Sequence, residues 1–315
     1  MVFVNIMKSK GVKTFLGLEE SDKGPFDIVI LPIPYEMTTS YKEGTEFGPN
    51  ACIEASSQVE LYDKLLQSDL PCGFKIHTSK PWEEEVSSLE EALTSITKFI
   101  EPWMNGNQFP IVLGGEHGLL LPVVESMKVH PKISGKLENL TIVQIDAHAD
   151  LRDELNEEKF SHGTVIRRSL DAGAGKVIQI GIRTYSSEEK EIMLNDRRIK
   201  TWFAQDLIDT NLDLSNWKKM IEQIKKISGP VWLTFDIDGL DGLLVPATGT
   251  PVPGGLSYWG AIEIIESLFS AKDAEVIGAD VNEICTSEGT NLTEFSAALI
   301  VTKILACHIA KNITE

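Results

Sequence analysis

Three apolar runs in this 315-residue chain each lead into a short segment with acidic residues, and two of these segments also contain a histidine. Residues 111–113 precede GGEH at 114–117, residues 141–145 precede DAHAD at 146–150, and residues 231–235 precede DID at 236–238. Carboxylates and imidazoles are the side chains that bind metal ions and move protons in hydrolytic sites. If the runs are neighbouring parallel strands, their carboxyl ends bring these groups to one edge of a sheet. The pattern therefore predicts chemistry at that edge.

The spacing within two of these segments strengthens the prediction. A single Asp after a strand is usually a turn former or a helix N-cap. Alternate residues of an extended chain share a face, however, so Asp146, His148 and Asp150 point to one side. Asp236 and Asp238 do the same. Such a group of acids and imidazoles is unstable through repulsion and desolvation unless a cation lies among them, so we expect a metal cluster.

The number of candidate ligands favours two metal ions. Six ligands, four of them carboxylates, exceed what one divalent ion with an open coordination position requires. Shared carboxylates can bridge two ions about 3.5–4 Å apart. The oxygen-rich donor set favours Mn²⁺, while the affinity order leaves Zn²⁺, Co²⁺ and Ni²⁺ open. The candidate metal ligands are His117, Asp146, His148, Asp150, Asp236 and Asp238.

The apolar pattern indicates the elements that position these groups. Continuous apolar runs are typical of parallel strands that are buried on both faces. The runs begin at Asp27, Pro110, Leu140, Val177, Val231 and Glu275, and helices are expected within residues 87–104 and after Gly48, His162, Ser215, Ser257 and Asn291. This alternation predicts an α/β fold, a three-layer α/β/α sandwich with a mainly parallel sheet. Without a repeat or a linker of distinct composition, residues 1–315 are expected to form a single domain.

Charge and cysteine usage limit the functional class. The basic and acidic residues give a net charge of 29 − 47 = −18, which argues against nucleic-acid binding and would attract a cationic substrate. No window of 18 residues is free of charge, so no membrane span is expected. The four cysteines lack CxxC spacing, as expected for reduced thiols in the cytoplasm. They are Cys52, Cys72, Cys285 and Cys307.

Seven motifs in one order resemble those of the ureohydrolases, the family of arginase and agmatinase. They are TTSYKEGTEFGPNACIEAS from Thr38, GGEH at 114–117, DAHAD at 146–150, SHGT at 161–164, DIDGLD at 236–241, PATGTPVPGGLS from Pro246 and GADVNE at 278–283. The resemblance covers roughly residues 25–305, and the longer match DAHADLRDE looks more like the agmatinase branch than the arginase branch. It implies an arginase-like fold and a homo-trimer or homo-hexamer.

The resemblance also implies a role for each site residue. One Mn²⁺ would be held by His117, Asp146, Asp150 and Asp236, and the other by Asp146, His148, Asp236 and Asp238. A hydroxide between the two ions would attack the carbon of the guanidinium group. The implied catalytic residues are Asp150, which would pass a proton to the leaving amine, His162, which would be a proton shuttle, and Glu283, which would pair with the guanidinium group.

The segment that follows Asp150 bears on the substrate. Residues 151–160 contain four acids, two bases and no Ser or Thr, so they would repel a carboxylate tail and tolerate the ammonium group of agmatine. The expected reaction is therefore the hydrolysis of agmatine to putrescine and urea, with guanidinobutyrate and arginine as alternatives. Several loop residues depart from the family pattern and leave the substrate open. They are Glu116, Gly118, Asp241-Gly242, Ala247 and Cys285-Thr286.

Two other classes of protein compete with this interpretation. Zinc amide deacetylases share such a sheet and a D-x-H element, but they use one metal ion and a Tyr, and the six candidate ligands argue against them. A catalytically silent homologue that binds a guanidine or a partner subunit would be recognised by the loss of a ligand. No ligand is missing from the sequence.

Overall fold

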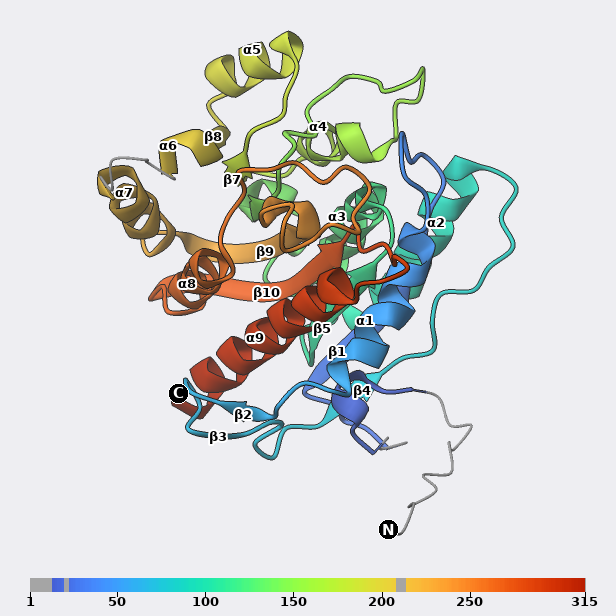
Figure 1. Ribbon diagram of the computed structural model, residues 1–315, viewed down its shortest axis with the longest axis vertical. Helices are drawn as coiled ribbons and strands as arrows, with labels where there is room; N and C mark the ends of the chain where they lie inside the picture. The colour runs from blue at the N-terminus through green and yellow to red at the C-terminus, as the bar shows by residue number, and fades with distance from the viewer. Residues whose placement is uncertain (1–12, 20–22, 208–213, 315) are drawn as a thin grey trace.

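The computed structural model describes residues 13–19, 23–207 and 214–314, and in this part of the chain eight parallel strands form one sheet (Figure 1). The strand order is β4-β1-β5-β10-β9-β6-β7-β8. In that order the strands are β4 (Ile76–Thr78), β1 (Ile28–Ile33), β5 (Phe109–Gly114), β10 (Asp273–Asn282), β9 (Ser228–Asp236), β6 (Thr141–Ile145), β7 (Lys176–Ile182) and β8 (Ile199–Phe203). The predicted parallel sheet is thus confirmed. The predicted single domain also includes residues 1–12, 20–22, 208–213 and 315, which lie outside the described residues.

The six strands predicted from apolar runs are the six inner strands of this sheet. The two edge strands were not predicted, for different physical reasons. β4 is only three residues long, and β8 has mixed composition because most of it is only partly buried. An edge strand needs no continuous apolar run, since it is covered less completely than a central one. A short antiparallel pair, β2 (Tyr62–Asp63) with β3 (Ser68–Asp69), lies outside the main sheet.

Helices cover both faces of the sheet and create two hydrophobic cores. Alternate residues of each strand contribute to opposite cores: Ile28 and Ile30 of β1 belong to one core, and Val29 and Leu31 belong to the other. The first core contains α1 (Gly48–Ser56), α7 (Ser215–Ile224), α8 (Tyr258–Phe269) and α9 (Leu292–Thr314). The second contains α2 (Leu89–Ile100), α3 (Leu120–Ser126), α4 (Val165–Asp171) and α5 (Ser187–Asn195). These two helical layers and the sheet make the predicted sandwich.

Local signals explain where several helices begin. The Ser88 side chain accepts a hydrogen bond from the backbone N–H of Glu91 at the start of α2, and Ser257 caps α8 in the same way. Ser186 and Glu189 form a reciprocal capping box at α5. The short helices α3, α5 and α6 (Ala204–Leu207) were not predicted, because few residues in each carry the periodic apolar signal.

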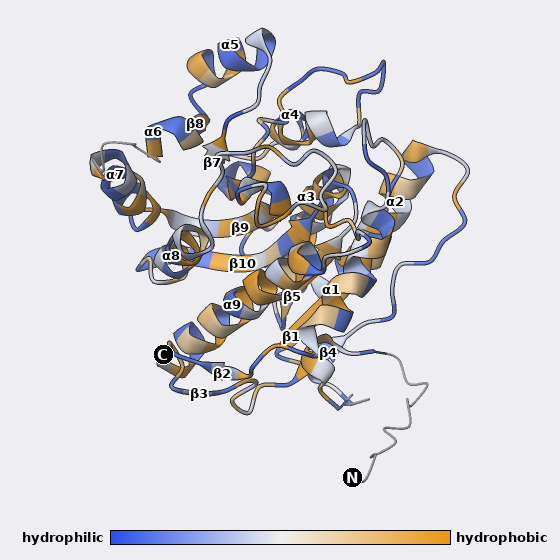
Figure 2. Ribbon diagram, in the orientation of Figure 1, coloured by the Kyte–Doolittle hydropathy of each residue, from blue (hydrophilic) through white to orange (hydrophobic). Residues whose placement is uncertain are grey.

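The last helix, α9, is long and apolar enough by length and composition to cross a membrane. Within the protein, however, 72% of its most apolar window is buried. Figure 2 shows hydrophobic colouring along α9 and on the neighbouring strands β1 and β5. Its composition is therefore explained by its place in the first hydrophobic core.

Candidate metal centre and active-site cavity

Four adjacent strands end at the candidate site. β5, β10, β9 and β6 are consecutive in the sheet, and because they are parallel their carboxyl ends share one edge. His117 follows β5, Asp146 follows β6, Asp236 is the last residue of β9 and Glu283 follows β10. The sheet topology thus brings together side chains that are up to 166 residues apart in the sequence.

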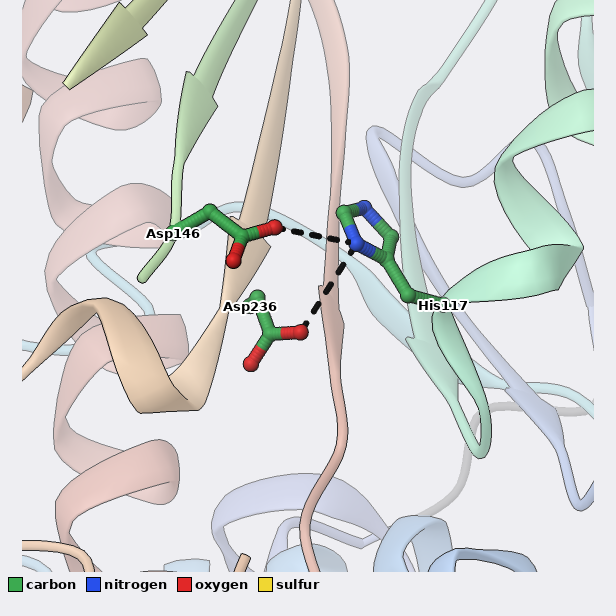
Figure 3. Close-up of side chains that lie close together, drawn as sticks. All are labelled: His117, Asp146 and Asp236. Atoms are coloured by element: carbon green, nitrogen blue, oxygen red, sulfur yellow. Dashed lines mark ion pairs between the residues drawn. The ribbon is translucent and has the colours of Figure 1, made fainter. Parts of the chain in front are cut away.

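The ring of His117 points toward the carboxylates of Asp146 and Asp236 (Figure 3). Its Nδ1 atom is 3.0 Å from a carboxylate oxygen of Asp150, 3.2 Å from one of Asp146 and 3.7 Å from one of Asp236. Although buried, Nδ1 makes no geometrically acceptable hydrogen bond to any described residue. A buried ring nitrogen that points among three carboxylates without a hydrogen bond is arranged as a metal ligand is.

His148 belongs to a second group on the other side of Asp146. Its Nδ1 atom is 3.0 Å from a carboxylate oxygen of Asp238 and 3.7 Å from one of Asp146. Two sets of ligand atoms that could each hold a metal ion are present, one of His117, Asp146 and Asp236, the other of Asp146, His148 and Asp238. Asp146 is common to both sets, whereas Asp236 belongs only to the first. All six candidate ligands are brought together.

Burial shifts the pKa values of the carboxyl groups in this cluster. Desolvation, with a contribution from Asp146, raises the pKa of Asp150 to about 7. Desolvation and the neighbouring Asp238 and Asp146 raise the pKa of Asp236 well above its usual value. Desolvation acts in the same direction on Asp146, but His117 and His148 outweigh it and lower the pKa of that carboxyl. The carboxylates therefore need positive charge among them, supplied by protons or by metal cations.

Two candidate catalytic residues have a left-handed backbone. The φ angle is 53° at Asp150 and 62° at Glu283. The carbonyl oxygen of Asp150 accepts hydrogen bonds from the backbone N–H groups of Ile166 and Arg167, so it is anchored to the start of α4. The backbone N–H of Glu283 donates to the carbonyl oxygen of Gly115. Such strained backbone is concentrated at functional sites, where surrounding contacts hold it in place.

Buried polar residues behind His117 were not predicted from the sequence. The Nε2 atom of His117 is 2.8 Å from Thr234 Oγ1, and this hydroxyl donates to Asp280 at 2.6 Å. Asp280 also accepts hydrogen bonds from Trp232 and Asn282. Their positions on β9 and β10 could have identified them, because Thr234 is on the same face of its strand as Asp236 and Asp280 lies in the GADVNE motif.

Arg183 and Asp241 hold the loops next to His148 and Asp238. The guanidinium group of Arg183 donates to the carbonyl oxygens of Asp238 at 2.7 Å and Val252 at 2.6 Å. The Asp241 carboxylate accepts from the backbone N–H groups of Leu243, Gly254 and Gly255. Arg183 was not predicted from the sequence, because a single Arg after a strand has no distinctive pattern. Asp241 thus has a structural role in a segment that departs from the family pattern.

A cavity of about 240 Å³ opens onto the cluster. It is lined by seven of the eight predicted site residues: His117, His148, Asp150, His162, Asp236, Asp238 and Glu283. Asp146, the eighth, lies in the cluster but does not belong to the lining.

Glu283 and His162 both line this cavity. One carboxylate oxygen of Glu283 accepts the backbone N–H of His117 at 2.7 Å. Burial raises the pKa of Glu283 to about 8. Burial, with His148 and His117 nearby, lowers the pKa of His162 to about 4, so its ring is neutral at pH 7. The cavity therefore has a buried carboxyl group suited to pair with a cationic ligand and an imidazole that is neutral at pH 7.

The structure gives the acids of residues 151–160 no direct contact with the cavity. The described residues that line the cavity include Arg152 and Leu155 from this segment but none of its four acids. Asp153 instead forms ion pairs with Arg167 and Arg168. These acids therefore belong to the surface of the protein, and they do not select the tail of a bound ligand by direct contact.

Comparison with known proteins gives concordant similarities. Residues 26–307 match the family described as the Arginase family. The chain is 34% identical over 304 residues to N(1)-aminopropylagmatine ureohydrolase of Synechocystis sp., with 94% of each chain covered. It is 33% identical over 279 residues to an agmatinase of Pyrococcus horikoshii, with 87% of this chain and 89% of that protein covered. The chain is also similar to the solved structure of a hypothetical agmatinase from Burkholderia thailandensis, with a TM-score of 0.82 and 24% sequence identity. The match covers 96% of this chain and 92% of that protein and indicates a common fold.

Proposed function

Because the chain belongs to the arginase family of hydrolases that act on amidino C–N bonds, we propose that it is a binuclear manganese enzyme that converts agmatine to putrescine and urea. The observation that carries the proposal is the pair of ligand sets that share Asp146, beside Glu283 in one cavity. The two ligand sets could bind two cations, and Glu283 could pair with a guanidinium group. One site therefore contains the groups that hydrolysis of a guanidine requires.

The donor atoms fit two divalent ions. His117 Nδ1 is buried and has no hydrogen bond to any residue that the structure describes, and the carboxyl groups of Asp150 and Asp236 have raised pKa values that nearby cations would lower. In the proposed assignment, His117, Asp146, Asp150 and Asp236 would hold one Mn²⁺, and Asp146, His148, Asp236 and Asp238 would hold the other. When bound, such a pair of ions lowers the pKa of a water molecule and supplies a hydroxide nucleophile at neutral pH.

Glu283 orients the substrate in this proposal. A planar guanidinium group pairs with a carboxylate through two parallel N–H···O bonds. Each carboxylate oxygen has two acceptor positions, so the oxygen that receives the His117 backbone N–H can still accept another hydrogen bond. Pairing with a cation also stabilises the charged form of this buried carboxyl group. Glu283 would therefore fix the guanidinium carbon in the cavity and contribute through positioning.

Asp150 and His162 are the proposed proton-transfer residues. The leaving nitrogen must gain a proton, because an amine leaves far more readily than an amide anion. Asp150 lines the cavity, and one of its carboxylate oxygens is 3.0 Å from His117 Nδ1, so this carboxylate lies at the cluster where it can take up a proton and pass it to the leaving nitrogen. His162 is neutral and partly exposed, so it can exchange protons with solvent at the cavity wall.

The relatives support a substrate with a cationic tail, since they are named for agmatine and for aminopropylagmatine. One observation favours a second candidate. Lys42 and Arg152 both line the cavity, and a cationic wall suits a tail that ends in a carboxylate, as in guanidinobutyrate. Arg152 Nε lies 3.8 Å from the buried carboxylate of Glu189, which offsets part of its charge. Agmatine remains the first proposal.

The test is urea release by Mn²⁺-loaded protein from four guanidines in parallel: agmatine, N(1)-aminopropylagmatine, guanidinobutyrate and arginine. The proposal predicts the highest kcat/KM for agmatine. Preference for aminopropylagmatine would retain the cationic tail but change the substrate. Preference for guanidinobutyrate or arginine would instead assign tail recognition to Lys42 and Arg152. Failure to release urea from all four would contradict the proposed activity.

A cytoplasmic location and a homo-trimeric or homo-hexameric assembly are also proposed, from the family resemblance. The four cysteines are free thiols, and three of them, Cys52, Cys285 and Cys307, are buried. Reduced buried thiols fit a cytoplasmic protein. Analytical ultracentrifugation tests the assembly, because a monomer at micromolar concentration would contradict it.

A further inference from the structure

Glu116 is a buried carboxylate to which the proposed chemistry gives no role. It lies two residues after the end of β5 and is 0% exposed. One of its oxygens accepts the backbone N–H groups of Met37 at 2.8 Å and Thr38 at 2.6 Å, and the other accepts the hydroxyl of Thr38. A Cβ atom on Gly118 would lie 3.0 Å from that second oxygen, so the absence of a side chain at Gly118 leaves room for it. Glu116 is thus held in one position by three donors.

The Thr38 hydroxyl connects this carboxylate to His162. A hydroxyl has one hydrogen to donate and two lone pairs that accept. The hydrogen is donated to Glu116. Burial raises the pKa of this carboxyl, but the hydrogen bonds from Thr38 and Met37 act in the opposite direction and favour the ionised form, which can only accept. The lone pairs then receive the backbone N–H of His162, with N···O at 3.2 Å, and face its Nδ1 atom at 3.3 Å. Because the hydroxyl hydrogen is already used, Nδ1 must be the donor in the last contact.

We propose that Glu116 and Thr38 are positioning residues that hold the neutral ring of His162 as the Nδ1–H tautomer, leaving the lone pair of Nε2 toward the cavity. Ser40 and His162 line the cavity, and Ser40 Oγ is 3.4 Å from Nε2. Thr38 and Glu116 are absent from the cavity lining formed by the described residues. Nδ1 therefore faces the protein interior, and the inference rests on the proposed role of His162 in proton transfer.

The tautomer decides whether His162 can act. A neutral imidazole accepts a proton only at the nitrogen that carries the lone pair. With Nε2 unprotonated, a proton from the cavity can be taken up there. The resulting imidazolium keeps its Nδ1–H directed at Thr38, with a Glu116 oxygen 3.9 Å from Nδ1. The opposite tautomer would present an N–H group to the cavity and could not accept a proton from it.

Glu116→Gln is the sharpest perturbation, because it keeps the shape of the side chain and reverses the hydrogen bonds. The two backbone N–H groups require an oxygen opposite them, so the new NH₂ group must face Thr38. It would donate to the hydroxyl, and the hydroxyl would donate to Nδ1. We therefore expect the Nε2–H tautomer of His162 in this variant.

The tautomer can be read from ¹⁵N spectra of histidine-labelled full-length protein at pH 7.5, without metal and with diamagnetic Zn²⁺. The His162→Gln variant assigns the signals. We expect a protonated Nδ1 in the wild type and a protonated Nε2 in Glu116→Gln. A wild-type His162 protonated on Nε2, or the same tautomer in both proteins, would overturn the proposal. If Glu116→Gln does not fold, Thr38→Val serves instead, and an unchanged Nδ1–H tautomer there overturns the proposal equally.

Steady-state kinetics supply a second readout for variants with unchanged Mn²⁺ content. Thr38→Val should lower kcat by about tenfold or more with little change in KM. A tenfold loss is smaller than the usual contribution of general acid–base catalysis to a reaction rate. Thr38→Ser retains the hydroxyl and should restore most of kcat. Thr97→Val, which removes a hydroxyl that bonds Leu93 in α2, is the matched control. Equal kcat in Thr38→Val and Thr38→Ser would contradict the relay, whereas an inactive wild type would contradict the proposed function.

Discussion

Thr234→Val should weaken Mn²⁺ binding although Thr234 is not a proposed ligand. When Nδ1 of His117 binds a metal ion, Nε2 carries the hydrogen and donates to the Thr234 hydroxyl, which in turn donates to Asp280. Valine has nearly the same shape but no hydroxyl. The substitution therefore leaves His117 Nε2–H without a partner and removes one donor from the buried carboxylate of Asp280.

The size of the effect follows from these two losses. A buried donor without a partner costs about 1–3 kcal/mol, and removal of such outer hydrogen bonds typically lowers metal affinity 10–100-fold. Since about 1.4 kcal/mol corresponds to tenfold at 25 °C, the two figures agree. Asp280 keeps its bonds from Trp232 and Asn282, so we expect the lower half of the range, about 10–30-fold.

Competition of the purified protein with a fluorescent Mn²⁺ chelator measures this change. The matched control is Thr302→Val in α9, where a buried hydroxyl donates to the carbonyl oxygen of Ala298 at 2.7 Å, away from the cluster. Both variants should lose some thermal stability without metal, but only Thr234→Val should lose affinity. Equal Mn²⁺ affinity in Thr234→Val and the wild type would refute the idea that this hydroxyl supports His117.

Three further predictions concern the cluster, the substrate and stability. Asp146→Ala should lose both metal ions and nearly all hydrolysis, because Asp146 belongs to both ligand sets; retention of full metal content by mass spectrometry would contradict the shared position. Glu283→Gln should keep both ions and raise KM for the guanidine, by about tenfold if one charge-assisted pair is lost, so metal loss would show that Glu283 is misassigned. Burial lowers the pKa of His308 to about 4. As the pH falls from about 6.5 to about 4, the unfolded state therefore binds a proton that the folded state does not bind. The free energy of unfolding should fall over that window by about 3 kcal/mol. In urea unfolding at pH 6.5 and 4.5, His308→Gln should lose less stability than the wild type, and equal losses would contradict the assignment.

The sequence predicts the parts of the fold in which apolar residues form an unbroken run or recur with a regular period. The inner strands are buried on both faces, so β1 and β5 read as unbroken apolar runs. β8 gives no such run, because residues 200–203 of this edge strand are not fully buried. The helix α2 is predicted by its amphipathic period, whereas α3 follows His117 with almost no polar face. Local composition thus predicts central elements better than peripheral ones.

In the candidate site, the sequence predicted the metal-ligand candidates but not the residues that hold them in place. Alternation after β6 predicted that Asp146, His148 and Asp150 would converge, although Asp150 reaches the cluster through a left-handed turn that alternation does not describe. The partners that hold these residues were not predicted. Thr234 meets His117 only because β5 and β9 both flank β10, and such contacts depend on the order of strands, which no short motif contains.

The count of Mn²⁺ ions per chain tests the central claim most directly. Metal-free protein would be incubated with excess Mn²⁺, separated from free ions by gel filtration, and analysed by inductively coupled plasma mass spectrometry together with its urea release from agmatine. The two ligand sets predict two ions per chain in the active protein. Full activity with a single bound ion, or with none, would contradict the binuclear site.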